Sequence, residues 1–392
     1  YKIIIPVLLL LITSLILLKS TSTGILLIKS TFYRQLIWIL IGFIVFILIQ
    51  FLNNKLYNEY AYYAYIVLIL LLLSIFFMPI IGGAQRWIKI GSFSFQPSEM
   101  GKLILVFTIS RFLCDQDTQK QPIRSILFTI MITLLPALLV FKQPDLGTSI
   151  IYLAIVFPML YWSGVKSYYL FLFLAPLISI IAAFELVAFY IWMAILILIM
   201  FYNQLKLINA IFNFIINISC GLLTPYIWFD ILYNHQRERI KVFLDPLSDP
   251  HDAGYQIIQS LTAIGSGGFW GKGFGQGTQT QLKFLPVRDT DFIISVLGEE
   301  HGFFGILFIS CTFLFMIYSI INYCERITSK FSSLTLIGLS TILFSHMVIN
   351  MGMTVGLFPV TGLPAPFISY GGTFLITCLI IVGIINSIIS QK

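Results

Sequence analysis

Two aspartates, Asp289 and Asp291, stand directly before an apolar run in the stretch "RDTDFIISVLGEE" (288–300). The same polar region carries the cations Lys272, Lys283 and Arg288. A positioned carboxylate with a suitable pKa can act as a general base, and nearby cations can bind phosphate. Asp291 is therefore a candidate base for an anionic substrate, with Lys272 as a candidate binding residue. Aspartate is also a favoured helix N-cap, so the residues alone leave a second interpretation open.

A second pair of charges, Glu99 and Lys102, occurs in "QPSEMGK" (96–102). Gln96, Pro97 and Ser98 indicate a helix start, and the i, i+3 spacing then places both charges on one helix face. Charged residues at or inside a membrane are functional candidates because their burial is costly. Glu99 and Lys102 either line a substrate cavity or form an ion pair at a helix end.

Other polar residues are open to two interpretations. Asp145, in "KQPDLGTS" (142–149), is a candidate binding residue, or it caps a helix that begins near Thr148. Glu299 and Glu300 lie two turns into a predicted span, between Gly298 and Gly302. They either handle a proton or belong to a kinked helix entry that is still near water, and we favour the second. His346 is solitary in its span, which favours a hydrogen bond between helices over a proton pathway.

Several kinds of site are excluded by spacing. The five cysteines include no CxxC pair, and no Cys/His cluster has the spacing of a zinc site. The sequence contains neither a GxSxG nucleophile motif nor a P-loop, since Gly273 follows Lys272 where Ser or Thr is needed. No block of basic residues indicates nucleic-acid binding.

The composition indicates what must position these residues. The chain is 58% hydrophobic and 10% charged, whereas soluble domains have about 25% charged residues. Apolar runs of nearly membrane-spanning length recur throughout. We predict an all-α polytopic membrane protein, a bundle of 10–12 transmembrane helices. The predicted spans are 3–18, 35–52, 60–78, 98–114, 125–141, 148–162, 168–183, 185–202, 207–228, 291–320, 331–350 and 371–390.

The loops divide into two sets. One set carries Lys55, Arg111, Lys120, Arg124, Lys166, Lys206, Arg326 and Lys330, and the positive-inside rule favours the cytoplasmic side for it. The opposite set contains four polar segments, 82–102, 142–149, 234–291 and 356–373. The long loop 234–291 includes "GSGGFWGKGFGQG", whose glycines permit close backbone approach to a ligand or make a flexible cover. The irregular segment 356–373 is expected to pack into the bundle, where it lines or plugs a cavity.

These four segments resemble the signatures of the SEDS family (shape, elongation, division and sporulation), in the family's order. The resemblance rests on "QRWIKIGSFSFQPSEMGK" (85–102), "QPDLGTS" (143–149), residues 243–293 and "NMGMTVGLFPVTGLPAPFISYGGT" (350–373). The forms "PVTGLPAPFISYGG" and "FLDP" resemble the elongation branch more than the division branch. The resemblance implies a single SEDS-type membrane domain over 1–392, including the extracytoplasmic loop 234–291. The family usually has ten spans, so an extra pair is expected near 184–228.

The resemblance also implies an activity. It implies a peptidoglycan glycosyltransferase of the bacterial cytoplasmic (inner) membrane that polymerises lipid II, with its site on the extracytoplasmic side. Asp291 matches the catalytic aspartate of the family's "TDF" motif and would be the general base. Glu99 and Lys102 match its "QPSE..K" motif. Lys102, Arg86 and Lys272 would stabilise the undecaprenyl pyrophosphate leaving group, alone or with a divalent cation, Mg²⁺ or Mn²⁺. A class B penicillin-binding protein, a transpeptidase, is the implied partner.

Two rival functions remain open. A lipid II flippase would need paired charges deep within its spans and alternating access, whereas most candidate charges here cluster on one face. A non-enzymatic scaffold that recruits a penicillin-binding protein would leave Asp291 dispensable.

Overall fold

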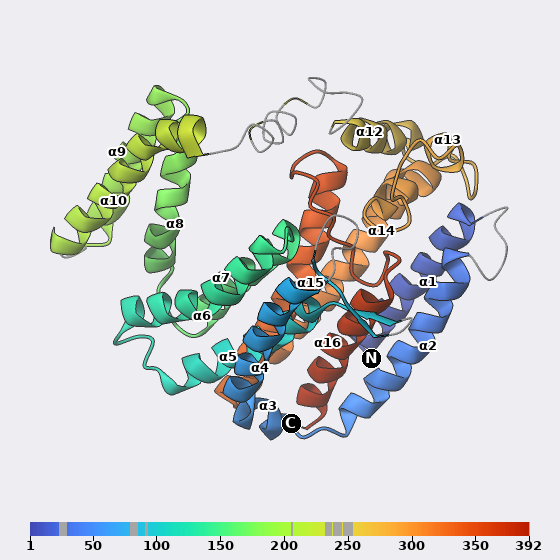
Figure 1. The fold of residues 1–392 in the computed structure, drawn as a ribbon, viewed down its shortest axis with the longest axis horizontal. Coiled ribbons are helices and arrows are strands. Elements are labelled where there is room, and N and C mark those ends of the chain that lie inside the picture. The colour runs from blue at the N-terminus through green and yellow to red at the C-terminus, as the bar shows by residue number, and fades with distance from the viewer. Residues whose placement is uncertain are drawn as a thin grey trace.

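A computed structural model describes residues 1–22, 30–78, 85–90, 93–204, 207–231, 237, 245 and 254–391. Twelve long helices lie within these residues, and each corresponds to one predicted span, so the all-α fold is confirmed (Figure 1). They are α1 (Ile4–Thr21), α2 (Thr31–Gln50), α4 (Ala61–Ser74), α5 (Pro97–Asp115), α6 (Pro122–Lys142), α7 (Leu146–Trp162), α8 (Ser167–Ala182), α9 (Leu186–Tyr202), α10 (Leu207–Tyr226), α14 (Ile293–Cys324), α15 (Lys330–Thr354) and α16 (Gly372–Ser390).

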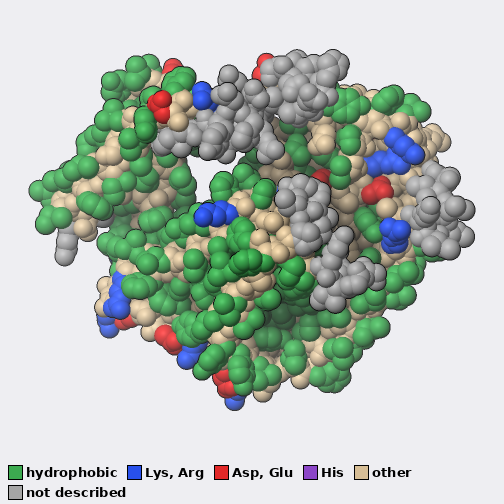
Figure 2. All heavy atoms as spheres, viewed as in Figure 1, with side chains coloured by type: hydrophobic (Ala, Val, Ile, Leu, Met, Phe, Trp, Pro, Cys, Tyr) green, Lys and Arg blue, Asp and Glu red, His purple; other side chains and the backbone are tan. Residues whose placement is uncertain are grey.

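The helices have the length and composition of membrane spans. Seven of the described helices are at least 18 residues long and apolar enough to cross a membrane, and four shorter ones are equally apolar. Hydrophobic side chains dominate the face shown in Figure 2, and charged side chains are few. Such an apolar surface is stable in contact with lipid tails, and a helix suits that environment because it satisfies its own backbone hydrogen bonds.

The main bundle is organised around α15. This helix packs against α5, α7, α14 and α16, while α2 packs along α16 and α1 along α14. The outer flank of the bundle is lipid-facing, but α15 itself is mostly enclosed by its neighbours. The polar side chains that α15 carries therefore face protein, where each needs a partner.

Helices α8, α9 and α10 form a separate cluster at one side of the bundle (Figure 1). They share a small core of their own, made of Leu172, Ala175, Met193, Leu196 and Met200. Helix α7 packs against α8 and connects this cluster to the main bundle. The expected extra pair at 184–228 falls on α9 and α10, two of these three helices.

Short elements cover the end of the bundle where α14 begins. They are the hairpin of β1 (Ile88–Ile90) and β2 (Phe93–Phe95), and the helices α12 (Tyr255–Gly267) and α13 (Thr278–Gln281). Helices α3 (Asn54–Glu59) and the 3₁₀ turn η2 (Ile75–Phe77) flank α4, and the π-helical turn η3 (Ile227–Ile231) follows α10. Much of the predicted loop 234–291, namely 234–236, 238–244 and 246–253, lies outside the described residues, as does Lys206.

Helix α14 is broken at Gly302, whose φ of 64° is in the left-handed region that favours glycine. A side chain at Gly302 would also meet the backbone of Gly271 in the α12–α13 loop. The predicted kink is confirmed. The expected nearness to water is wrong, because Glu299 is 0% and Glu300 1% exposed beneath that loop.

The segment 356–373 packs into the bundle as expected. Ala365, Phe367 and Ile368 are buried, and the Asn350 amide of α15 donates to the Leu363 carbonyl at 2.7 Å. The Ser14 hydroxyl of α1 donates to the Ile368 carbonyl at 2.6 Å. These bonds satisfy irregular backbone that lipid would not tolerate.

Candidate functional site

Asp291 lies at the end of a turn that is held from several sides. Its N–H donates to the Val287 carbonyl at 3.1 Å, and its carbonyl accepts from the Asn350 amide at 2.9 Å. The Ser369 hydroxyl donates to the Thr290 carbonyl at 2.5 Å. The N-cap of α14 is Phe292, and no side chain caps that helix end. Of the two interpretations of Asp291, the helix cap is therefore not what the structure shows.

The carboxyl group of Asp291 is half-buried. Burial raises its pKa above the ordinary aspartate value, against a smaller opposing effect of the Thr290 side chain. Among the residues that the structure describes, no basic side chain forms an ion pair with it. Gly362, at φ 71°, approaches so closely that a side-chain carbon there would lie 3.5 Å from Oδ2 of Asp291. A desolvated carboxylate without a cation has the higher proton affinity that a base requires.

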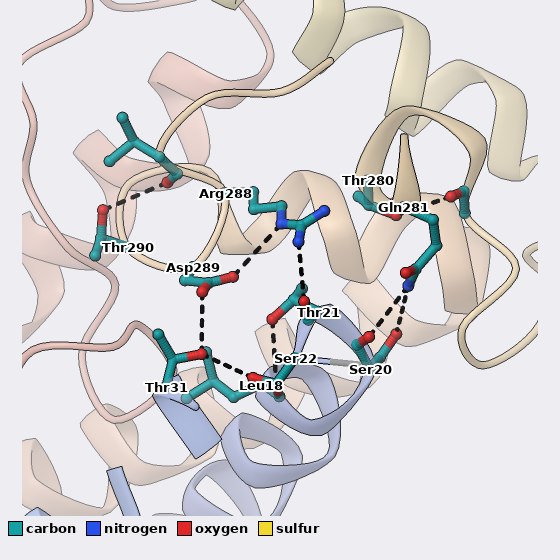
Figure 3. Close-up of polar contacts among 12 residues, drawn as sticks. Leu18, Ser20, Thr21, Ser22, Thr31, Thr280, Gln281, Arg288, Asp289 and Thr290 are labelled. Carbon is teal, nitrogen blue, oxygen red and sulfur yellow. Dashed lines mark hydrogen bonds and ion pairs between the residues drawn. The ribbon is translucent and has the colours of Figure 1, made fainter. Parts of the chain in front are cut away.

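Asp289 faces a different neighbourhood from the one expected. Its Oδ2 accepts from the Thr31 hydroxyl at 3.0 Å, and its Oδ1 lies 3.8 Å from Nε of Arg288 (Figure 3). Arg288 in turn donates to the Thr21 carbonyl at 2.9 Å. The family motif singles out Asp291 and so predicts that the neighbouring Asp289 is a solvated acid. That prediction is wrong, because the Asp289 side chain joins this turn to the ends of α1 and α2.

Glu99 and Lys102 form the predicted pair in the first turns of α5. The Lys102 ammonium donates to Oε2 of Glu99 at 2.7 Å and lies 2.8 Å from Nε2 of His346. Because an ammonium can only donate, Nε2 accepts and the neutral ring carries its proton on Nδ1. Lys102 also lies over the Phe374 ring at 5.5 Å, and it is 0% exposed. The ion pair is therefore internal rather than interfacial.

One face of α15 connects this pair to the Asp291 turn. His346 and Asn350 are four residues apart, so they are neighbours on one side of the helix. His346 contacts Lys102, and Asn350 holds the backbone of Asp291. The structure thus brings Glu99, Lys102 and Asp291 together at one end of the bundle.

Asp145 and Arg86 belong to the same end. Asp145 caps α7, accepting from the Thr148 N–H at 3.2 Å and its hydroxyl at 3.0 Å, as one of the two interpretations expected. The Gln96 amide also donates to Asp145 at 2.9 Å. The Arg86 guanidinium donates to the carbonyls of Gln143, at 3.2 Å, and Pro144. Asp145 therefore holds the starts of α5 and α7 together, and Arg86 holds the segment before β1 against the turn between α6 and α7.

The described contacts of the Lys272 side chain are with Glu299 and Thr278, and none is with Asp291. Its ammonium donates to Oε1 of Glu299 at 2.8 Å and to the Thr278 hydroxyl at 2.7 Å. Glu299 also accepts from the N–H groups of Gln279 at 2.9 Å and Thr280 at 3.0 Å. Lys283 is exposed. The described contacts give Lys272 a role in fixing the loop, and its predicted role with substrate stays a prediction.

Two residues of the site were missed or underrated by reasoning from sequence. Asn350 was not singled out, although an amide inside an apolar run must find a partner, which is a usable signal. His346 was expected to make a hydrogen bond between helices, and it does so with Lys102. The sequence gives no sign that this bond reaches the charged pair of α5.

A divalent cation would have to bind with the substrate. No three His, Cys, Asp or Glu side chains gather at one place within the described part of the chain. Mg²⁺ commonly binds through one or two carboxylates together with substrate phosphates, keeping several waters. A cation held mainly by the pyrophosphate and its waters is compatible with these residues, and it would leave the Asp291 carboxylate free to act as the base.

Comparison with known proteins adds independent information. The family model described as "Cell cycle protein" (FtsW/RodA/SpoVE) matches residues 1–193 and 167–392. The two matches together span the whole chain, and they overlap on α8 and the start of α9.

Curated relatives and solved structures agree with that match. The chain is 33% identical to "Peptidoglycan glycosyltransferase MrdB" of Escherichia coli (strain K12), over 92% of this chain and 85% of that protein. It is 29% identical to "Peptidoglycan glycosyltransferase RodA" of Treponema pallidum (strain Nichols), over 96% of each chain. A chain from "Structural coordination of polymerization and crosslinking by a peptidoglycan synthase complex" aligns over 100% of this chain and 97% of its own, at 24% identity, with a TM-score of 0.77.

Proposed function

Because this chain belongs to the FtsW/RodA/SpoVE family of cell cycle proteins, the SEDS family, we propose that it is a peptidoglycan glycosyltransferase that polymerises lipid II. Relatives with this activity in their names match more than nine-tenths of the chain. The observation that carries the proposal is the half-buried Asp291, which has no ion-pair partner among the described residues. Asn350 holds its backbone, one turn along α15 from the His346 that contacts Lys102. A buried base at a membrane edge suits a substrate whose lipid tail stays in the bilayer.

The proposed reaction transfers one sugar to another. The 4-hydroxyl of the acceptor N-acetylglucosamine attacks C1 of the donor sugar, and the bond from C1 to the pyrophosphate breaks. Asp291 accepts the hydroxyl proton, which the raised pKa of its carboxyl group favours. Undecaprenyl pyrophosphate leaves. Loss of polymerisation when Asp291 is replaced by Asn is the direct test of this role.

The leaving group needs positive charge close by. Lys102 is the nearest candidate in the site, but its ammonium already serves Glu99 and His346. We propose that the bound pyrophosphate competes with Glu99 for Lys102, assisted by Arg86. A divalent cation, Mg²⁺ or Mn²⁺, remains part of the proposal and would neutralise charge on the pyrophosphate. Activity after chelation, with each metal restored in turn, tests that part.

The site is proposed to face the extracytoplasmic side of the bacterial inner membrane. The loops at the opposite end carry the basic residues that favour the cytoplasm, among them Lys55, Arg111 and Lys330. Cysteines introduced singly at exposed Lys283 and exposed Lys55 test the orientation. An impermeant thiol reagent should label the first in intact cells and the second only after lysis; the reverse pattern would overturn it.

A class B penicillin-binding protein is the proposed partner. Uncrosslinked glycan strands give no mechanical wall, so a polymerase gains from coupling to a transpeptidase. A solved neighbour of similar fold comes from work on coordinated polymerisation and crosslinking. Co-purification in mild detergent with the cognate transpeptidase is expected, and its absence would count against the pairing.

The decisive experiment uses the purified chain alone with fluorescent lipid II. Formation of glycan polymer supports the synthase. A scaffold forms none, and a flippase moves lipid II across a vesicle membrane without lengthening it. Glu99, Lys102 and Asp291 cluster at one end of the bundle. This favours the synthase over the flippase, because an alternating-access transporter has its substrate site near the bilayer midplane.

A further inference from the structure

A large apolar cavity separates the α8–α10 cluster from the main bundle. Its volume is about 530 Å³, within the range of roughly 300–1,000 Å³ that is typical of ligand pockets. Side chains of α6, α7, α8 and α10 line it, among them Leu127, Phe157, Leu177 and Ile216. Both Leu127 and Leu177 are about half exposed, so the cavity wall is not closed by packing.

A polar pocket adjoins one end of this cavity. It measures about 460 Å³ and shares Ile123, Tyr169 and Asn209 with the apolar cavity. The cations Lys120 and Arg124 line it. The two spaces are therefore adjacent, so that a polar, basic mouth lies next to an apolar interior.

The mouth has an excess of positive charge. Lys120 pairs with Asp117 at 3.0 Å, and Arg124 donates to the Gln121 side chain at 3.1 Å, so one positive charge remains uncompensated among these four residues. The Lys120–Asp117 pair is largely exposed and can exchange partners at little cost.

Helix N-termini line the mouth. Helices α6, α8 and α10 begin among the residues that line it and α9 ends there, while α5 and α7 end just outside it, at Asp115 and Trp162. The N-terminus of a helix carries a partial positive charge and free N–H groups, which favour an anion.

The mouth lies at the opposite side of the membrane from Asp291. Helix α5 begins beside the Asp291 turn and ends at Asp115, so α6 begins on the far side. A group bound at Lys120 and Arg124 is thus a whole membrane thickness from the reacting sugars.

We propose that this site holds an anionic phospholipid of the leaflet opposite Asp291. Its phosphate lies at Lys120 and Arg124, and its acyl chains fill the apolar cavity, replacing side-chain packing between α8–α10 and the bundle. Lipid chains suit the cavity because it opens between membrane helices, and a phosphate suits the mouth because cations and helix N-termini converge there. The site does not depend on the proposed glycosyltransferase activity.

Native mass spectrometry of the delipidated, purified chain with dioleoylphosphatidylglycerol tests the headgroup. The wild type should retain one such lipid more tightly than dioleoylphosphatidylethanolamine. The double variant Lys120→Gln, Arg124→Gln should bind it about tenfold more weakly, given the usual strength of lysine and arginine near anionic lipids. The matched control Lys55→Gln, Arg326→Gln removes the same charge from exposed positions on the same side, and should bind like the wild type.

A second pair of variants tests the cavity. Leu127→Trp fills the space and should also lose the lipid, whereas Leu138→Trp, on the same helix and equally exposed but outside the cavity, should not. Equal retention by all variants would overturn the proposal. So would competition by inorganic phosphate alone, which indicates an anion site, or tighter retention of a polyprenyl phosphate, which indicates a substrate tail.

Discussion

Lys102 pairs with Glu99 at 2.7 Å beside the Asp291 turn, and Lys272 pairs with Glu299 at 2.8 Å beneath the α12–α13 loop. In the second pair the carboxylate has four hydrogen-bond donors, because Glu299 accepts from one ammonium, one hydroxyl and two backbone N–H groups. In the first region, Lys102 is the one described side-chain donor to Glu99, and Asp291 has no described ion pair.

The comparison shows that a buried lysine–glutamate pair can belong to a binding site or can fix a loop, depending on how many hydrogen-bond donors the carboxylate has. Hydrogen bonds that saturate a buried carboxylate fix a loop and leave nothing for a ligand. A buried carboxylate with few hydrogen-bond donors destabilises the free protein, and contacts with a bound substrate can offset that destabilisation. Replacements in the first region should therefore affect catalysis, and those in the second should affect stability.

The largest effect is expected for Asp291→Asn. Polymerisation should fall by about 10²–10⁴-fold, as is typical when a positioned base is lost. The midpoint of thermal unfolding should not fall, because an amide avoids the burial of a charge. Asp289→Asn is the matched control, since its amide oxygen can still accept from Thr31. Both are measured at equal concentration of folded protein, and equal damage in the two variants would remove the distinction between them.

Lys102→Ala should lose both polymerisation and stability. Lys102 is 0% exposed, so its removal leaves Glu99 uncompensated, at a cost of about 3–5 kcal/mol. The double variant Glu99→Gln, Lys102→Met removes both charges and should fold nearly as well as the wild type while polymerising poorly. Polymerisation assays and thermal unfolding on the same samples separate the two effects; a double variant with the wild-type rate would show that the pair is structural.

Glu299→Gln should destabilise the protein without disabling the folded fraction. It weakens charge-assisted bonds that are worth about 1.5–3 kcal/mol each, and limited proteolysis should cut the α12–α13 loop faster. Glu325→Gln, an exposed acid at the far end of α14, is the control and should leave unfolding unchanged. If Glu299→Gln lost activity per folded molecule as severely as Asp291→Asn, the two regions would not differ as described.

The smallest effect concerns pH. Only the deprotonated Asp291 can accept a proton, so the rate should be lost as pH falls through its pKa. Because burial raises that pKa, the acidic limb of the rate profile should lie above that of an ordinary aspartate. The Asp289→Asn variant should share the same limb. A limb at or below the ordinary aspartate value would show that a substrate or cation lowers the pKa in the working complex.

The sequence was sufficient for the helices and for bonds within one turn. Apolar runs placed all twelve spans, local spacing predicted the Glu99–Lys102 pair, and a helix cap was one of the two interpretations of Asp145. It failed where partners are distant in the chain. Nothing local indicates that Asp289 meets Thr31, or that Glu300 accepts from the Ser20 hydroxyl across 280 residues. Those pairings are made by helix packing, which spacing does not encode.

The break in α14 at Gly302 has a consequence for the biogenesis of the protein. The carbonyls of Glu299 and Glu300 accept from the N–H groups of Lys272 and Gly273, each at 3.0 Å, while the Phe303 N–H donates to the Gly268 carbonyl at 2.9 Å. A helix normally enters the bilayer with its own backbone groups satisfied, but here the loop supplies them. The loop is synthesised before α14. These hydrogen bonds of α14 can therefore form only when the loop has reached the same end of the bundle, so that insertion of the helix and placement of the loop are coupled.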